Sequence, residues 1–65
     1  MTSYRKLEKV RRQAQEEADR IHAVRVIVEY ATNGVPCLYI RPPKRARNLV
    51  RKHSEARILA AVRPR

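Results

Sequence analysis

The fold is decided by the central stretch Val24-Arg-Val-Ile-Val-Glu-Tyr-Ala-Thr-Asn-Gly-Val-Pro-Cys-Leu-Tyr-Ile-Arg41. Its first part is rich in β-branched residues, which favour a strand. Asn33-Gly34 then predicts a two-residue hairpin turn, because both residues tolerate a positive φ. Cys37 to Ile40 predicts the returning strand, and Pro36, which lacks an amide hydrogen, stands at its start. We therefore predict a β-hairpin over about residues 24–41.

The register of this hairpin gives it two apolar faces. A two-residue turn places Ile27 opposite Ile40 and Val28 opposite Tyr39. One face then carries Val26, Val28, Tyr30, Cys37 and Tyr39. The other carries Ile27, Leu38 and Ile40, interrupted by Arg25 and Glu29. Because a two-stranded ribbon is marginal by itself, we expect either one helix on each face or a second copy of the chain.

Helices are predicted on both sides of the hairpin. Apolar residues recur at steps of three and four over residues 4–21, which indicates an amphipathic helix capped by Thr2 or Ser3. Pro42-Pro43 can open a second helix over residues 44 to about 62, and the tail Arg63-Pro64-Arg65 is expected to fray. The sequence thus predicts one α+β domain over residues 1–65 in the order α-β-β-α. The predicted core residues are Leu7, Val10, Ile21, Val26, Val28, Leu38 and Ile40.

The predicted second helix has two apolar faces. At about 100° per residue, one face carries Ala46, Leu49, Val50 and His53. The nearly opposite face carries Ile58, Leu59 and Val62. One straight helix cannot bury both sets against one core. Either the helix breaks near His53-Ser54, or the second set contacts a partner; we favour the partner, and with it a homodimer or a complex.

Charge is the strongest functional signal in the sequence. The 65 residues carry 16 Lys and Arg against 6 Asp and Glu, a formal net charge of +10. Such an excess on a small domain indicates a polyanion or an acidic protein surface as partner. The single Cys37 excludes an internal disulfide framework, and no apolar run is long enough to span a membrane. Without a signal peptide, the expected location is the cytoplasm.

The densest basic block runs from Arg41 to His53 and coincides with the start of the predicted second helix. Free amides and the positive end of the helix dipole favour a phosphate there. The residues expected to bind nucleic acid or an acidic partner are Arg41, Lys44, Arg45, Arg47, Asn48, Arg51 and Lys52. A secondary basic surface is expected on the first helix, at Arg5, Lys6, Lys9 and Arg12.

The element order and the segment Lys44-Arg45-Ala46-Arg47 distantly resemble the double-stranded-RNA-binding domain. That family has an α-β-β-β-α order and a basic cluster that opens its last helix. This chain lacks one of those strands, and Ala56, Ala60 and Ala61 echo the small residues of the family's last helix only faintly. As an analogy, the resemblance implies that structured RNA is a candidate partner.

Neither a metal site nor an active site is predicted. Cys37, His22 and His53 are potential ligands without a close-spaced pair, whereas structural zinc takes four ligands in paired spacings. The chain has no Gly-rich phosphate loop and is too short to enclose an ordinary ligand pocket. We expect no cofactor and no enzyme activity. Tyr30 and Tyr39 could stack on bases, but we interpret them as core side chains.

Three functions stay open on the sequence alone. The first is a DNA- or RNA-binding module whose affinity depends strongly on salt. The second is a small regulator or inhibitor, of the kind found in phages and mobile elements, that docks on a larger host protein through arginine and apolar patches. The third is a basic component of a ribonucleoprotein. The first is the function that we favour.

Overall fold

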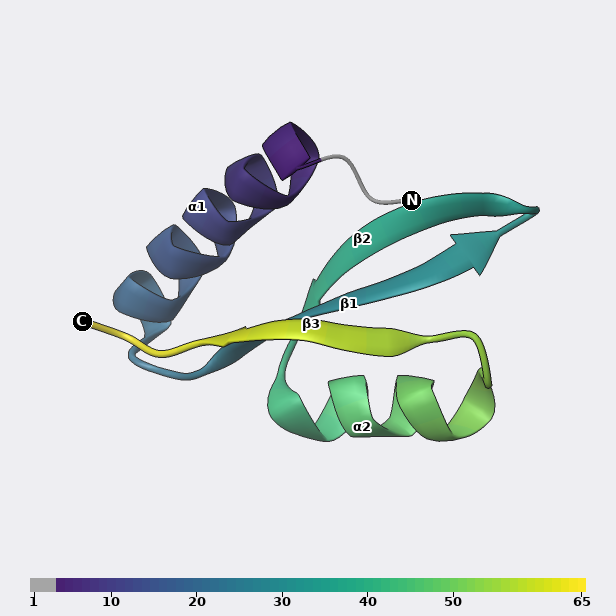
Figure 1. The fold of residues 1–65 in the computed structure, drawn as a ribbon. Coiled ribbons are helices and arrows are strands. Elements are labelled where there is room, and N and C mark those ends of the chain that lie inside the picture. Colours follow the sequence, from purple (N-terminus) through teal and green to yellow (C-terminus); the bar gives the residue numbers. More distant parts are fainter. Residues whose placement is uncertain (1–3) are drawn as a thin grey trace.

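The computed structural model describes residues 4–65, with the backbone alone for Tyr4 and Arg5. The elements are α1 (Tyr4–Ile21), β1 (Arg25–Thr32), β2 (Val35–Arg41), α2 (Pro43–Lys52) and β3 (Arg57–Val62). The strands form one antiparallel sheet in the order β2-β1-β3 (Figure 1). The α+β class and the hairpin flanked by two helices are confirmed. The predicted caps Thr2 and Ser3 lie outside the described residues.

β1 and β2 form the predicted hairpin in the predicted register. Ile27 is the partner of Ile40, and Val28 is the partner of Tyr39. Asn33 and Gly34 have φ values of 53° and 79°. Positive values at both central residues define the type I′ turn, whose twist matches that of the flanking strands. The sequence signal for the turn therefore also determined which residues share a face.

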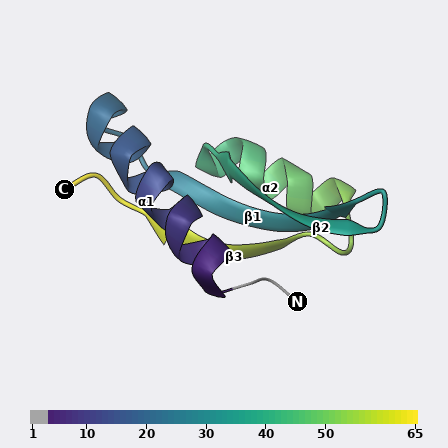
Figure 2. The same ribbon diagram turned by 90° about the horizontal axis from the view of Figure 1, so that it is seen from above.

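Each face of the sheet is covered by its own helix, so the domain has three layers. α1 lies above the sheet in Figure 1 and α2 below it, and Figure 2 shows α2, drawn fainter, beyond the strands. The first buried cluster joins α1 to one face through Ala14, Ala18, Ile27 and Val62. The second joins α2 to the other face through Val26, Val28, Ala46 and Ala56. Of the two expected ways to cover the hairpin, the chain uses one helix on each face.

The predicted core is right in its centre and wrong at one end. Val26 and Val28 are buried, and Leu7, Val10, Leu38 and Ile40 are half-buried against the first cluster. Ile21 is wrongly predicted, because it lies in the last turn of α1 and is 41% exposed. Ile27 and the buried alanines of both helices were not in the predicted core. Alanine at these positions lets the helix backbone approach the sheet closely.

The prediction of a helix over residues 44–62 is wrong beyond Lys52. α2 ends there, and Arg57–Val62 returns as β3, which pairs with β1. Of the two expected outcomes, the structure shows the less favoured one, a helix that breaks near His53-Ser54, and a strand follows the break. Ala60 pairs with Ile27 and Ile58 with Val28, which leaves Leu59 as the extra residue of a bulge.

The third strand also corrects the predicted partner contact for two of its three residues, Leu59 and Val62. Val62 is buried in the first cluster and Leu59 packs against it, while Ile58 stays 48% exposed. The second apolar set of the predicted helix is therefore accommodated largely within the chain. Both observations that pointed to a second copy, the two-faced hairpin and the two-faced helix, are explained by the described fold of one chain.

The C-terminal tail, which was expected to fray, is hydrogen-bonded to α1. Gln15 Nε2 donates to the carbonyl oxygen of Arg63 at 2.8 Å. The backbone N–H of Arg65 donates to Oδ1 of Asp19, also at 2.8 Å. This bond, together with one from the Gln15 side chain, lowers the pKa of the Asp19 carboxyl group below its ordinary value of 3.8. The tail therefore runs along α1 beyond the end of β3.

Candidate nucleic-acid interface

The predicted binding residues lie around the outer side of α2. Burial of Ala46 against the sheet fixes the rotation of this helix. At about 100° per residue, its opposite side presents Lys44, Asn48 and Arg51, with Arg47 at one flank and Arg45 and Lys52 at the other. These five cations and Asn48 are exposed, whereas the sixth cation, Arg41 at the end of β2, is half-buried. We call the six cations the α2 basic surface: Arg41, Lys44, Arg45, Arg47, Arg51 and Lys52.

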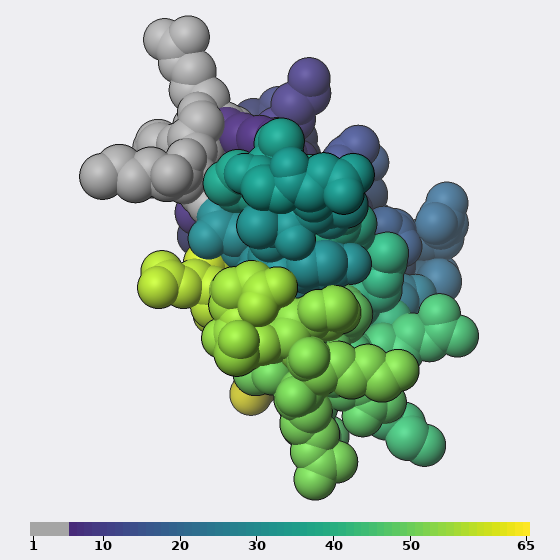
Figure 3. Space-filling view, turned by 90° about the vertical axis from the view of Figure 1, so that its right-hand side faces the viewer, coloured from purple at the N-terminus to yellow at the C-terminus, as the bar shows by residue number. Residues whose placement is uncertain are grey.

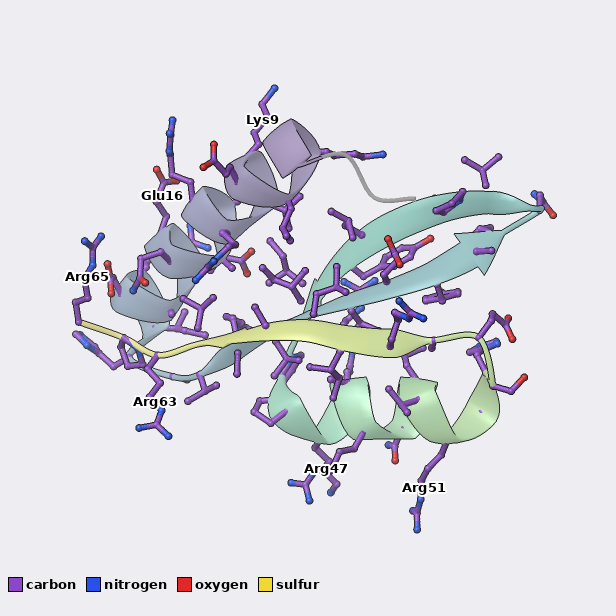
Figure 4. All side chains as sticks on the ribbon, viewed as in Figure 1. Lys9, Glu16, Arg47, Arg51, Arg63 and Arg65 are labelled. Atoms are coloured by element: carbon purple, nitrogen blue, oxygen red, sulfur yellow. The ribbon has the colours of Figure 1, made fainter. Side chains whose placement is uncertain are left out.

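No cation of the α2 basic surface forms an ion pair with another residue of the described range 4–65. The ion pairs found there join Arg25 to Glu17, His53 to Glu55 and Arg65 to Asp19. Four of the six acidic residues lie on α1, across the sheet: Glu8, Glu16, Glu17 and Asp19. In Figure 4, Arg47 and Arg51 point away from the sheet on the side opposite Lys9 and Glu16. The positive charge of α2 is thus concentrated on one side of the molecule.

The start of α2 adds unpaired amides to this charge. The N-cap residue Pro42 makes no side-chain capping bond, and Pro43 has no N–H to donate. The N–H of Ala46 bonds to the carbonyl of Pro42 at 2.9 Å, so the N–H groups of Lys44 and Arg45 have no partner within the helix. Cations at this end oppose the helix dipole by roughly 0.3–1 kcal/mol each. A bound anion would relieve this repulsion and accept hydrogen bonds from the amides.

A row of stacked rings lies beside α2 on the same face of the sheet. The Tyr30 ring centroid is 4.7 Å from that of Tyr39 and 4.9 Å from that of His53, with interplanar angles of 21° and 7°. The Arg41 guanidinium carbon lies 5.2 Å from the Tyr39 ring centroid. Because Tyr30 is stacked against two rings, a base could stack on it only by displacing one of them. This arrangement agrees with the interpretation of Tyr30 as a core side chain, and it holds Arg41 beside the start of α2.

An open groove of about 650 Å³ lies between α2 and β3. In Figure 3 the green side chains of α2 project from the lower part of the molecule. Val50 and Ile58 contribute apolar surface to the groove and are 36% and 48% exposed. Neither is among the residues predicted to bind nucleic acid, because Val50 was assigned to an apolar face of the predicted helix and Ile58 to the set expected to contact a partner. The only sequence signal that could have placed Ile58 beside α2 was the change of apolar face after His53.

The secondary basic surface lies on the outer side of α1. Lys6, Lys9 and Arg12 are exposed there, and the side chain of Arg5 is outside what the structure describes. The structure therefore separates the two predicted basic sites, which lie on opposite sides of the sheet. A single rigid ligand on α2 would not reach α1.

Comparison with known proteins finds no matching family model, no matching curated protein and no matching solved structure. The observed order α-β-β-α-β also departs from the order of the double-stranded-RNA-binding domain, because the third strand follows α2. No helix within residues 4–65 is long and apolar enough to cross a membrane. Nor does the described part of the chain bring together three His, Cys, Asp or Glu side chains that could hold a metal.

Proposed function

We propose that the protein is a non-enzymatic nucleic-acid-binding module that contacts the phosphates of DNA or structured RNA through the α2 basic surface. One observation carries the proposal: six cations gather around one short helix, and none is paired with an acid of residues 4–65. Arginine presents a planar fork of donors that fits phosphate. Most of the affinity would come from neutralising the backbone, with little preference for sequence.

The test compares two charge-matched triple variants. Arg45, Arg47 and Arg51 are replaced together with Gln on α2, and Lys6, Lys9 and Arg12 are replaced together with Gln on α1. Gln is nearly as good a helix former as Lys and Arg, so both variants should fold. The affinity for a DNA duplex is measured over a range of salt concentrations, with protein in excess so that the tighter site dominates.

We expect the α2 variant to bind more weakly and with a shallower dependence of log K on log salt. The slope should shrink by about 0.9 for each lost phosphate contact, and by up to about 2.7 for all three. The α1 variant should change the slope much less, although it has lost the same charge. Equal weakening in both variants would place binding on net charge alone, and no weakening in either would remove nucleic acid as the ligand of α2.

The groove beside α2 supports a second candidate, docking on a larger protein. It combines the exposed apolar side chains of Val50 and Ile58 with the cations Arg47 and Arg51. Interfaces between proteins are enriched in arginine around an apolar centre. Replacing Val50 and Ile58 with Ser should abolish capture of such a protein and leave the affinity for a nucleic-acid duplex unchanged, because neither side chain bears charge.

A further inference from the structure

The second basic surface of the molecule has a charge pattern of its own. Lys6, Lys9 and Arg12 are exposed on the N-terminal half of α1, and none forms an ion pair with a described residue. Two acids of the C-terminal half are already engaged. Glu17 Oε1 lies 3.8 Å from Arg25 Nε, and Asp19 Oδ2 lies 3.5 Å from a guanidinium nitrogen of Arg65. The N-terminal half of α1 therefore keeps a net positive charge, because Glu8 is the one acid in it. We call Lys6, Lys9 and Arg12 the α1 basic surface.

The fold holds the two basic surfaces back to back. α1 and α2 pack against opposite faces of one sheet through separate buried clusters. In Figure 4, Lys9 points away from the sheet on the α1 side, and Arg47 and Arg51 point away on the α2 side. With helices about 10 Å thick and a sheet between them, the two surfaces are separated by roughly 25–30 Å.

This separation decides how a duplex can bind. A duplex is straight over lengths far beyond 33 Å, the longest dimension of the Cα trace, because its persistence length is about 500 Å. A duplex on α2 therefore cannot bend around the sheet to reach α1. Two duplexes on the two sides would be separated by more than two Debye lengths at 0.1 M salt, where this length is about 10 Å, so they would repel each other little.

From this geometry we propose that one protein molecule bridges two nucleic-acid duplexes. The tighter duplex would lie on the α2 basic surface and a weaker second duplex on the α1 basic surface. The inference rests on the proposed nucleic-acid binding and adds to it a second site and a cross-linking activity. The α1 site is the weaker one because it has three cations rather than six, and because Glu8 lies among them and Glu16 on the same helix.

The test measures stoichiometry with a short duplex in excess. A DNA duplex of about 12 base pairs is about 40 Å long, which leaves room for one protein molecule on each duplex. Sedimentation equilibrium at about 0.1 M salt, the concentration at which the two duplexes would repel each other little, gives the mass of the complex. We expect one protein molecule with two duplexes for the wild type and one duplex for the α1 variant described above. The second duplex should bind the α1 variant at least about tenfold more weakly than it binds the wild type.

The outcomes separate this inference from the proposed function. A wild-type complex of one protein molecule and one duplex would overturn bridging and leave the proposed function intact. An α1 variant that still holds two duplexes would also overturn it, as would a complex of two protein molecules with two duplexes, which would indicate bridging by a dimer. If the wild type binds no duplex at all, both proposals fail. Circular dichroism of each variant establishes that it is folded before its mass is interpreted.

Discussion

Two adjacent residues at the centre of β1 test the three-layer arrangement. Ile27 and Val28 are both fully buried, but Ile27 belongs to the cluster under α1 and Val28 to the cluster under α2. In a sheet with one solvated face, one of two successive residues would tolerate truncation. Here both should be sensitive. Truncation of Ile27 to Ala should cost about 2–5 kcal/mol. Truncation of Val28 to Ala removes one carbon fewer and should cost about 1.5–3 kcal/mol.

These costs are large against the stability of so small a domain. At roughly 0.05–0.15 kcal/mol per residue, the whole chain has a free energy of unfolding of about 3–10 kcal/mol. Each kcal/mol lowers the melting temperature of a domain of this size by roughly 4–8 °C. Thermal melts followed by circular dichroism should therefore show Ile27→Ala at least about 8 °C below the parent, and Val28→Ala at least about 6 °C below it.

The matched control is Val35→Ala. It makes the same chemical change as Val28→Ala in another strand, where the side chain is 59% exposed. Loss of β-propensity is common to both substitutions, so the difference between them measures burial. If Val28→Ala melts no lower than Val35→Ala, α2 does not cover this face and the three-layer arrangement is wrong.

Two of the left-handed residues and the tail anchor give three further predictions. His22 follows the end of α1 with a φ of 54°, and the N–H of Ala23 bonds to the carbonyl of Ala18, as in a Schellman motif; His22→Gly should raise the free energy of unfolding in urea by up to about 1 kcal/mol, and a loss of stability would contradict this cap. Gly34→Ala should lower the free energy of unfolding by about 1 kcal/mol, because an L residue is strained at a φ of 79°. The cost comes from the backbone alone, since an added Cβ would meet nothing within 4 Å. Because the pKa of Asp19 is lowered in the folded state, its contribution to stability is fully present above pH 3.8 and is lost as the pH falls through the lower folded value. The amide signal of Arg65 in NMR spectra should therefore move only in that acidic range, and a shift near neutral pH would contradict the anchor.

The parts of the fold that were predicted correctly depend on signals between near neighbours in the chain. Asn33-Gly34 specifies the turn, the turn specifies the register, and the register determines which residues share a face. The stripe on α1 likewise has a period that a single helix explains. The conclusion that both faces of the hairpin needed cover followed from these local facts, and α1 and α2 provide that cover.

β3 could not be predicted in the same way because its structure depends on a distant partner. Leu59, Ala60 and Ala61 are good helix formers, so the local preference of this segment is helical. The free edge of β1 competes with that preference, since pairing there satisfies the backbone and lets Val62 reach the cluster under α1. The sequence indicated only that one straight helix fails after His53.

The exposure of the five cations on α2 could be predicted in spite of that error, because it depends on the helical period of ten residues alone, and their binding role stays a prediction. A helix of this length is marginal by itself in water, and repulsion among its cations makes it more so. Its structure must therefore come from the packing of Ala46 in the cluster that β1 and Ala56 complete. β3, which was not predicted from the sequence, follows α2 and pairs with the edge of β1 that β2 leaves free. The pairing of β3 with β1 thus helps to hold α2 in place. The cations of α2 can then face outward together without an acid beside them.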